Sequence, residues 1–187
     1  PYLVPGSEGM KMLQELRGRK VHVTAMTNSL GSTDEPVVHL GYGKYREPML
    51  DLGVELYEVS AHRVKKNRRL NLFGSALGRL HAKLAVIDRK TLFVGSMNLD
   101  PRSASINTEL GAVIESPQLA KEMLRIIDID RLQNAYRVRR KASAPQQLEW
   151  LGIEEDSEVV LDAEPDSSWW QRLKLLLLRP FVPETLL

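Results

Sequence analysis

A histidine and a lysine stand two residues apart in the segment Leu80-His81-Ala82-Lys83. The residues that follow, 84–87, are all apolar, which is typical of a strand buried on both faces. Alternate residues of a strand project from one face, so a strand over 80–87 places the imidazole beside the ammonium group. An imidazole titrates near neutral pH and can serve as nucleophile or acid, and a fixed cation stabilises phosphoryl oxygens. The pair is therefore suited to phosphodiester chemistry.

More polar side chains follow further along the chain. Gly95-Ser96-Met97-Asn98 combines a glycine, which lets a ligand approach the backbone, with a hydroxyl and an amide donor. Asn107 and Glu109 again stand two residues apart. A carboxylate at Glu109 can hold the ring of His81 in one tautomer and support its positive charge. We therefore expect Ser96, Asn98 and Glu109 to complete the site of His81 and Lys83.

Asp88 comes directly after the predicted strand and is followed by Arg89-Lys90. Fully extended, the stretch from His81 to Asp88 spans roughly 23 Å. Geometry alone therefore predicts that Asp88 fixes the turn after the strand and does not contact substrate.

The spacing His81-x-Lys83-x4-Asp88, followed by Gly95-Ser96-x-Asn98, resembles the signature of the phospholipase D superfamily. One histidine on a strand is more often structural than catalytic, but the whole set at this spacing argues against coincidence. The wider chain is similar to the C-terminal catalytic half of bacterial cardiolipin synthases, nearest the C type. The similar segments cover nearly the whole chain and are 2–6, 27–30, 38–42, 53–58, 98–103, 164–165 and 169–170.

This resemblance implies a reaction that uses no metal or other cofactor, in which two half-sites meet across a pseudo-twofold axis. One histidine attacks phosphorus to give a phosphohistidine, the other protonates the leaving alcohol, and an incoming alcohol or water releases the product. Carried over, it makes His81, Lys83, Asp88 and Glu109 catalytic residues, with Lys83, Ser96 and Asn98 as phosphate ligands. His81 is then nucleophile or acid, and its place in a second half favours the acid.

The chain holds one such motif, because His22, His39 and His62 lack the lysine and aspartate that follow His81. The sequence begins at Pro1, and the next residues are typical of the end of a buried strand. We therefore expect a fragment whose partner half-site comes from a missing N-terminal half or from a second copy. Alone, the fragment is expected to be inactive.

A second group of polar residues lies in segments similar to the synthases and is a candidate for the substrate side. Its members are Asn28, Ser29, Asp34, His39 and Tyr42. Without the resemblance, Asn28 and Asp34 are typical loop caps, and His39 and Tyr42 are typical helix-packing residues. Both interpretations stay open at this stage.

The predicted helices and strands, which must position these residues, indicate a mixed α/β fold with a mainly parallel sheet flanked by helices. Helices to about residue 17 and over 36–52, alternating with strands over 20–26 and 54–59, predict parallel strands joined by right-handed crossovers. Further strands are expected over 80–87, 91–94, 108–114 and 136–140, with a helix over 117–134. We expect residues 1–187 to form a single phospholipase D-like domain. In it, 145–187 is a C-terminal extension made of an acidic connector and a helix over 167–179.

Length and composition set limits on the class of protein. A chain of 187 residues favours one domain, and the absence of cysteine excludes disulfides and thiolate metal sites. The formal net charge of +2 is too small to indicate a nucleic-acid partner, although residues 62–69 form a strongly basic run.

The C-terminal helix carries two tryptophans and the leucines 175–178 together with basic residues. This run is far shorter than the roughly 20 apolar residues that span a bilayer. The helix either lies at a membrane interface or covers the core of the intact protein. The resemblance implies a peripheral protein at the cytoplasmic face of the bacterial inner membrane.

Three functions compete. In the first, a phosphatidyl group passes to phosphatidylglycerol and gives cardiolipin. In the second, the chain is a nuclease with one motif per chain and a dimeric site, in which the basic run follows a DNA backbone. In the third, it is a phosphate-binding half without activity. The modest charge makes nucleic acid the weaker partner, and the intact set of polar residues argues against the third function.

Overall fold

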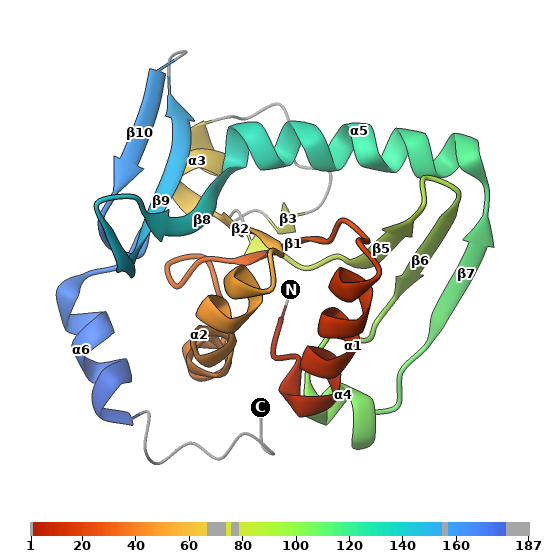
Figure 1. The fold of residues 1–187 in the computed structure, drawn as a ribbon, viewed down its shortest axis with the longest axis horizontal. Helices are drawn as coiled ribbons and strands as arrows, with labels where there is room; N and C mark the ends of the chain where they lie inside the picture. Colours follow the sequence, from red (N-terminus) through yellow and green to blue (C-terminus); the bar gives the residue numbers. More distant parts are fainter. Residues whose placement is uncertain (1, 67–73, 76–78, 155–156, 179–187) are drawn as a thin grey trace.

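The computed structural model describes residues 2–66, 74–75, 79–154 and 157–178, and shows the mixed α/β fold that the sequence predicts (Figure 1). Its elements in chain order are α1 (Gly6–Gly18), β1 (Thr24–Asn28), α2 (Pro36–Asp51), β2 (Glu55–Val59), α3 (Ala61–Lys66), β3 (Gly74–Ser75), β4 (Arg79–Leu80), β5 (Lys83–Ile87), β6 (Thr91–Gly95), α4 (Pro101–Ser105), β7 (Gly111–Glu115), α5 (Pro117–Asn134), β8 (Ala135–Lys141), β9 (Ala144–Glu154), β10 (Ser157–Leu161) and α6 (Trp169–Leu178).

The larger sheet has the strand order β1-β2-β8-β9-β10. β1 and β2 pair in parallel around α2, as the alternation of helices and strands predicts. The expectation of a mainly parallel sheet is wrong, because within the described residues every other ladder is antiparallel. β8 and β9 follow one another through a short turn, and such a connection is long enough only for an antiparallel pair.

A second, three-stranded sheet is formed by β5, β6 and β7. Asp88 (φ 51°) and Arg89 (φ 57°) form the turn of the β5–β6 hairpin, and Lys90 N donates to Ile87 O at 3.0 Å. Positive φ at successive central residues is what a tight hairpin requires. Asp88 therefore lies in the turn, at the opposite end of β5 from Lys83, as its spacing predicts.

The strand expected over residues 80–87 is interrupted. β4 ends at Leu80 and β5 begins at Lys83, so His81 and Ala82 connect two short strands. Nor is β5 buried on both faces, because Ala85 and Ile87 are exposed. α5 contacts β5 and β6, whereas every residue of β7 is exposed, which leaves this sheet open on its outer side.

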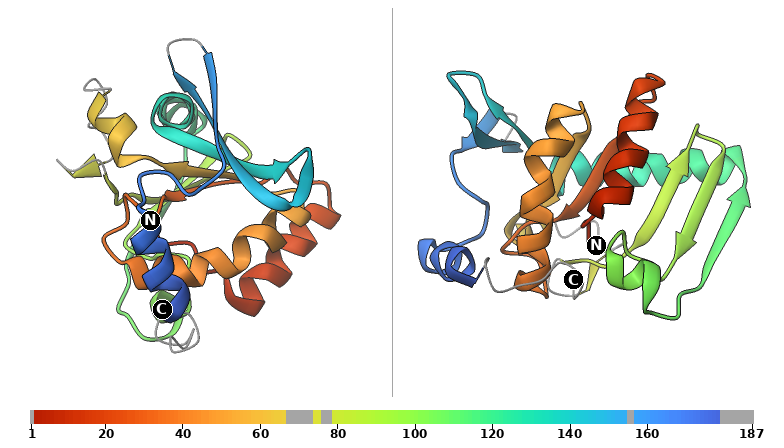
Figure 2. Two further views of the ribbon diagram at one scale, coloured as in Figure 1. Left: turned by 90° about the vertical axis from the view of Figure 1, so that its left-hand side faces the viewer. Right: turned by 60° about the horizontal axis from the view of Figure 1, so that its bottom comes forward.

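The main core lies between α1, α2 and the larger sheet. It is formed by Leu3, Val4, Leu13, Tyr42, Met49, Val54, Leu56, Tyr136, Val138 and Trp150. α5 runs along the top of Figure 1 and contacts both sheets, through β2, β8 and β9 on one side and β5 and β6 on the other. The views in Figure 2 show the same arrangement. This helix therefore fixes β5, which begins at Lys83, two residues after His81, relative to the main core.

The acidic connector expected before the last helix is instead largely strand. β9 and β10 occupy this region and continue the larger sheet. Leu148 and Trp150, two residues apart on β9, contribute to the core, and this alternation is the signal that the acidic composition concealed. The C-terminal helix is confirmed as α6, and residue 179 lies outside the described residues.

Candidate active site

The side chains of His81 and Lys83 meet, although no continuous strand joins them. Lys83 Nζ lies 3.1 Å from His81 Nε2 and also donates to the carbonyl oxygen of His81 at 3.1 Å. An ammonium group has only donors, so Nε2 is the nitrogen that accepts. His81 is exposed and Lys83 half-buried. The pair thus places an unprotonated ring nitrogen in contact with a positive charge at an accessible place.

Three carboxylates surround Lys83. Partial burial lowers the pKa of Lys83, and the negative charges of Asp34, Glu109 and Asp100 act against that shift. These carboxylates come from the loop before α2, the segment before β7 and the N-cap of α4. The fold therefore brings Asp34, a candidate for the substrate side, and Glu109 into the electrostatic range of the predicted catalytic lysine.

Ser96 and Glu109 are joined directly, since Ser96 Oγ donates to the carboxylate of Glu109. Asn107 Nδ2 donates to Glu109 Oε1 at 3.2 Å, and Leu110 N donates to Ser96 Oγ at 3.0 Å. The hydrogen bond from Ser96 is the main reason why the pKa of Glu109 lies below its usual value. No hydrogen bond joins Glu109 to His81 in the part of the chain that the structure describes, so the orienting role of Glu109 stays a prediction.

Asn98 lies at the start of the loop that leads into α4. Its Nδ2 is 3.5 Å from Ser103 Oγ, and its Oδ1 accepts from Tyr2 N at 3.4 Å. Both contacts are at the long limit for a hydrogen bond. The half-buried amide is therefore held in place while it can still donate to a further oxygen atom.

Asn28, a candidate for the substrate side, makes its hydrogen bonds with the protein backbone. It ends β1, it is buried, and its amide pairs with the backbone of Leu80: Nδ2 donates to Leu80 O at 2.9 Å, and Oδ1 accepts from Leu80 N at 2.8 Å. Leu80 is the residue before His81. Asn28 thus fixes the backbone that carries the histidine, and its amide is occupied by protein.

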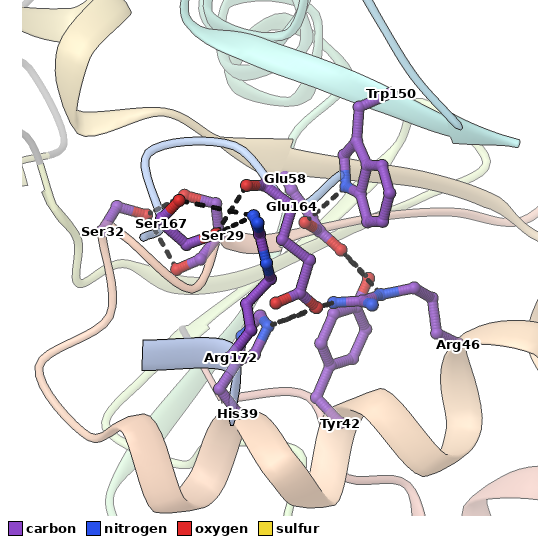
Figure 3. Close-up of polar contacts among 10 residues, drawn as sticks. All are labelled: Ser29, Ser32, His39, Tyr42, Arg46, Glu58, Trp150, Glu164, Ser167 and Arg172. Carbon is purple, nitrogen blue, oxygen red and sulfur yellow. Dashed lines mark hydrogen bonds and ion pairs between the residues drawn. The ribbon is translucent and has the colours of Figure 1, made fainter. Parts of the chain in front are cut away.

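Ser29 is fully buried and is likewise occupied by protein. Its Oγ lies 3.1 Å from Ser32 Oγ, which donates to Val59 O at 2.6 Å (Figure 3). The hydroxyl of Ser29 is thus engaged by protein, and a role for Ser29 on the substrate side stays a prediction. Its hydroxyl closes the turn between β1 and α2.

His39 and Tyr42 lie on the buried face of α2 and help to line a small recess. The recess is lined by Tyr2, Leu3, Thr27, Asn28, Thr33, Val38, His39 and Tyr42. It borders the site, because Tyr2 Oη donates at 3.0 Å to Asp34, one of the carboxylates near Lys83. The helix-packing interpretation of His39 and Tyr42 thus holds, and both residues also form part of the wall beside the site.

Behind this recess lies a buried ionic network (Figure 3). Glu58, which is fully buried, accepts from Tyr42 Oη at 2.9 Å and from Trp150 Nε1 at 2.8 Å, and pairs with Arg46 Nε at 2.9 Å. Arg46 Nη2 in turn lies 2.7 Å from Glu164 Oε1. Of this network only Tyr42 was predicted as a candidate, and Arg46, Glu58 and Trp150 were not. The signal was present: Arg46 falls in the row 39, 42, 46, 49 that forms the buried face of α2.

Comparison with known proteins establishes the family. Residues 1–131 match the family described as "Cardiolipin synthase, PLD-like domain". The chain belongs to this family. Cardiolipin synthase C of Escherichia coli K12 is 36% identical over 180 residues, which cover 94% of this chain and 37% of that protein. Cardiolipin synthase of Staphylococcus aureus Mu50 is 26% identical over 155 residues, which cover 83% of this chain and 27% of that protein. The chain thus spans well under half the length of these relatives.

A solved structure agrees with the fold of this phospholipase D-like domain. Nuc of Salmonella typhimurium, described as a phospholipase D family member, aligns with a TM-score of 0.51 at 22% identity. The alignment covers 73% of this chain and 76% of Nuc. The family resemblance and the α/β fold class inferred from the sequence are therefore confirmed.

Within the described residues, no helix has both the length and the apolar character needed to cross a membrane.

In this cardiolipin synthase-type domain, Asn28→Ala is expected to lower the rate of phosphodiester transfer by about 10- to 100-fold, because a displacement of the reacting group by about 1 Å costs that much. The change also removes the two hydrogen bonds that Asn28 makes with Leu80 N–H and C=O. The measurement is the rate of lipid transfer by the full-length protein together with its thermal midpoint. Thr24→Ala, an exposed site on the same strand, serves as the control. A normal rate for Asn28→Ala would contradict the positioning role.

Glu164 gives the fold a defined dependence on pH. Burial favours the neutral acid, but His39 and Arg46 outweigh it and lower the pKa of Glu164 to about 2. Because the folded value lies below the unfolded one, this stabilisation is complete above about pH 4.5 and is lost as the pH falls toward 2. Glu164→Gln is expected to lower the free energy of unfolding by about 2–3 kcal/mol at neutral pH.

Urea denaturation at pH 7, 5, 4 and 3 measures this effect. The difference between the native protein and Glu164→Gln is expected to shrink steadily below about pH 4. Glu122→Gln, which removes an exposed carboxylate of α5, is the matched control and is expected to change little. A difference that does not depend on pH would contradict the ionised state of Glu164.

Proposed function

We propose that this chain is the second catalytic half of a cardiolipin synthase-like phosphatidyltransferase that acts on phospholipid phosphodiesters. The contact between Lys83 Nζ and His81 Nε2 carries the proposal, because it joins an imidazole, which can act as nucleophile or acid, to a cation that can stabilise phosphoryl oxygens. Family membership and the neighbouring Ser96, Asn98 and Glu109 support it. A phosphatidylglycerol-like lipid is the substrate and a cardiolipin-like lipid the product.

The reaction passes through a phosphohistidine and uses no metal or other cofactor. One histidine attacks phosphorus, and the bond from phosphorus to the headgroup oxygen breaks. The other histidine gives its proton to that oxygen, so that an alcohol leaves. The hydroxyl of a second lipid then attacks the phosphohistidine, and its proton returns to the second histidine. Lys83 and Asn98 hold the phosphoryl oxygens and Ser96 assists, while His81 is one of the two histidines.

The second histidine comes from outside the 187 residues. Two sources fit: another segment of a longer protein, as the 37% coverage of the E. coli relative allows, or a second copy of this chain. In this account residues 1–187 act as one domain, in which Glu109 orients His81 in the assembled site and Asp88 acts through the hairpin turn. The lipid substrate makes a peripheral membrane position the expected one, at the cytoplasmic face of the bacterial inner membrane.

A dimeric nuclease is the second candidate, because the chain has one motif and a basic run at 62–69. Arg63 of that run is buried: its Nε donates to Gln133 O at 3.1 Å, and its guanidinium lies 4.8 Å from the centre of the Tyr136 ring. It is therefore occupied within the fold. Residues 67–69 lie outside the described residues. The charge of Arg63 is thus not available to a DNA backbone, which weakens this argument for the nuclease.

The test offers the full-length protein two substrates in parallel, phosphatidylglycerol vesicles and DNA. The expected result is cardiolipin and free glycerol from the vesicles, and intact DNA, with both cardiolipin and glycerol absent for His81→Ala. DNA cleavage that depends on His81, without lipid turnover, would replace this proposal by the nuclease.

A further inference from the structure

The C-terminal helix α6 has two faces of different character. One face packs on the protein, where Leu175 is only 8% exposed. At the start of the helix, Arg172 Nη1 donates to Ser167 Oγ at 3.2 Å and to Ser167 O at 3.4 Å, which ties α6 to the segment before it (Figure 3). α6 also contacts α2, the helix that carries His39. This face fixes how the helix is rotated about its own axis.

The other face is apolar and open. Its exposed side chains are Trp169 (56%), Trp170 (58%), Leu176 (60%) and Leu177 (65%), and Leu173 is half-buried between them. The spacing 169, 173, 176, 177 places these residues on one side of a helix. The two indole rings are stacked, with centroids 4.0 Å apart. In water this face exposes two tryptophans and two leucines next to each other, which is unusual for a soluble surface.

The charges of α6 indicate which partner covers this face. The helix contains Arg172 and Lys174 and no acidic residue, and Lys174 is exposed. Tryptophan, leucine and lysine together are what a helix needs to lie in the headgroup region of a bilayer, with the ammonium group reaching the anionic lipid phosphates.

We propose that the open face of α6, formed by Trp169, Trp170, Leu173, Leu176 and Leu177, docks the domain on an anionic phospholipid surface. This inference rests on the proposed function, because a lipid-transfer site must meet its substrate at a membrane. It names the element that makes the contact. The helix lies flat in the interface and does not cross the bilayer.

The segment before α6 fastens the helix to the wall of the site. Glu164 pairs with Arg46 at 2.7 Å and with His39 at 3.3 Å. Asp166 Oδ2 accepts from Ser60 Oγ at 2.7 Å, and Pro165 is fully buried between these anchors. The docking helix therefore has a fixed orientation relative to the recess that borders the site.

The shape of the molecule agrees with this orientation. In Figures 1 and 2, α6 and α4 lie on the same side of the molecule, and α4 follows directly after the loop that carries Asn98. Ile106, the residue after α4, is also largely exposed. α6 and the helix that follows the phosphate ligand Asn98 are therefore found on one side of the molecule.

The test measures how the full-length protein partitions onto vesicles of phosphatidylcholine with phosphatidylglycerol, by flotation. Trp170→Ala combined with Leu177→Ser is expected to weaken partition by at least about tenfold, because it removes a large part of the buried apolar area. Lys174→Gln is expected to weaken it about fivefold at low salt, with a smaller effect at high salt. The matched control, Leu119→Ala combined with Ile153→Ser, removes exposed apolar side chains of α5 and β9 and is expected to have no effect.

Binding is read without turnover, so the two proposals can fail separately. His81→Ala is expected to bind vesicles like the native protein, and vesicle binding without cardiolipin formation would reject only the proposed function. Partition that is unchanged by the α6 substitutions would overturn the docking role. The docking role would also be overturned if the α6 substitutions left partition unchanged but lowered the thermal midpoint or altered the oligomeric state. Such a result would show that this face packs against protein.

Discussion

Replacing His81 with alanine is expected to lower the rate of phosphatidyl transfer by about 10⁴-fold or more, since it removes a group that takes part in both chemical steps. The Lys83 ammonium group lies 3.1 Å from the ring and loses its acceptor at the same time. The measurement is the rate of cardiolipin formation by the full-length protein at saturating phosphatidylglycerol. Stability is expected to change little, because His81 is exposed.

His22→Ala is the matched control, because His22 is an exposed histidine outside the motif and lies before β1. A second substrate separates the two roles open to His81. A phosphatidyl ester with a nitrophenol leaving group needs no proton to depart. If His81 is the acid, the His81→Ala protein is expected to carry out the first step with this substrate. If His81 is the nucleophile, the first step is expected to stay lost. A His81→Ala protein that keeps its full rate on phosphatidylglycerol would reject the site itself.

Replacing Glu58 with glutamine is expected to lower the free energy of unfolding by about 3–5 kcal/mol, the cost of leaving a buried charge without its partner. Arg46 is buried beside it, and the negative charges of Glu58 and Glu164 are what keep the pKa of Arg46 raised despite its burial. Tyr42 and Trp150 also depend on the Glu58 carboxylate for their hydrogen bonds. Urea denaturation followed by circular dichroism measures the loss.

The partner substitution provides the control for this prediction. Glu58→Gln combined with Arg46→Gln removes both charges, so the double variant is expected to lose clearly less stability than the sum of the two single changes. If the losses of stability of the two single variants simply added up in the double variant, the ion pair between Glu58 and Arg46 would not be important for stability. A loss below about 1 kcal/mol for Glu58→Gln alone would contradict it as well. The matched surface variant is Glu47→Gln, which removes an exposed carboxylate of α2.

Local patterns were sufficient to predict much of this fold. The parallel pair β1–β2, the long helix α5 with its Ser116 cap and the turn at Asp88 follow from periodicity, capping and spacing alone. The sheet direction was wrong for two reasons: an acidic composition concealed β9 and β10, and the antiparallel pairing of the expected strands β5, β6, β7 and β8 was not apparent from their own patterns. Pairing between distant strands leaves no mark in the short windows from which such patterns are drawn.

In the candidate site too, some features could be predicted from the sequence and others could not. The contact of Lys83 with His81 and the placement of Ser96 and Glu109 follow from residue type and spacing. The role of Asn28 does not, because its partner is the backbone of Leu80, and a backbone contact 52 residues away has no sequence signature. Glu58 was missed for a related reason: a buried carboxylate is stable only with its arginine, and the pair is visible only once the fold joins α2 to β2.

The most direct test of the whole account is to trap the covalent intermediate. Full-length protein is mixed with radiolabelled phosphatidylglycerol, quenched within a single turnover and digested, and the labelled peptide is identified. The account predicts a phosphatidyl group bound to a histidine, either His81 or the histidine of the partner half-site, with a linkage that is labile to acid and stable to base. Cardiolipin formation with no label on histidine, and with inversion of configuration at phosphorus, would contradict it.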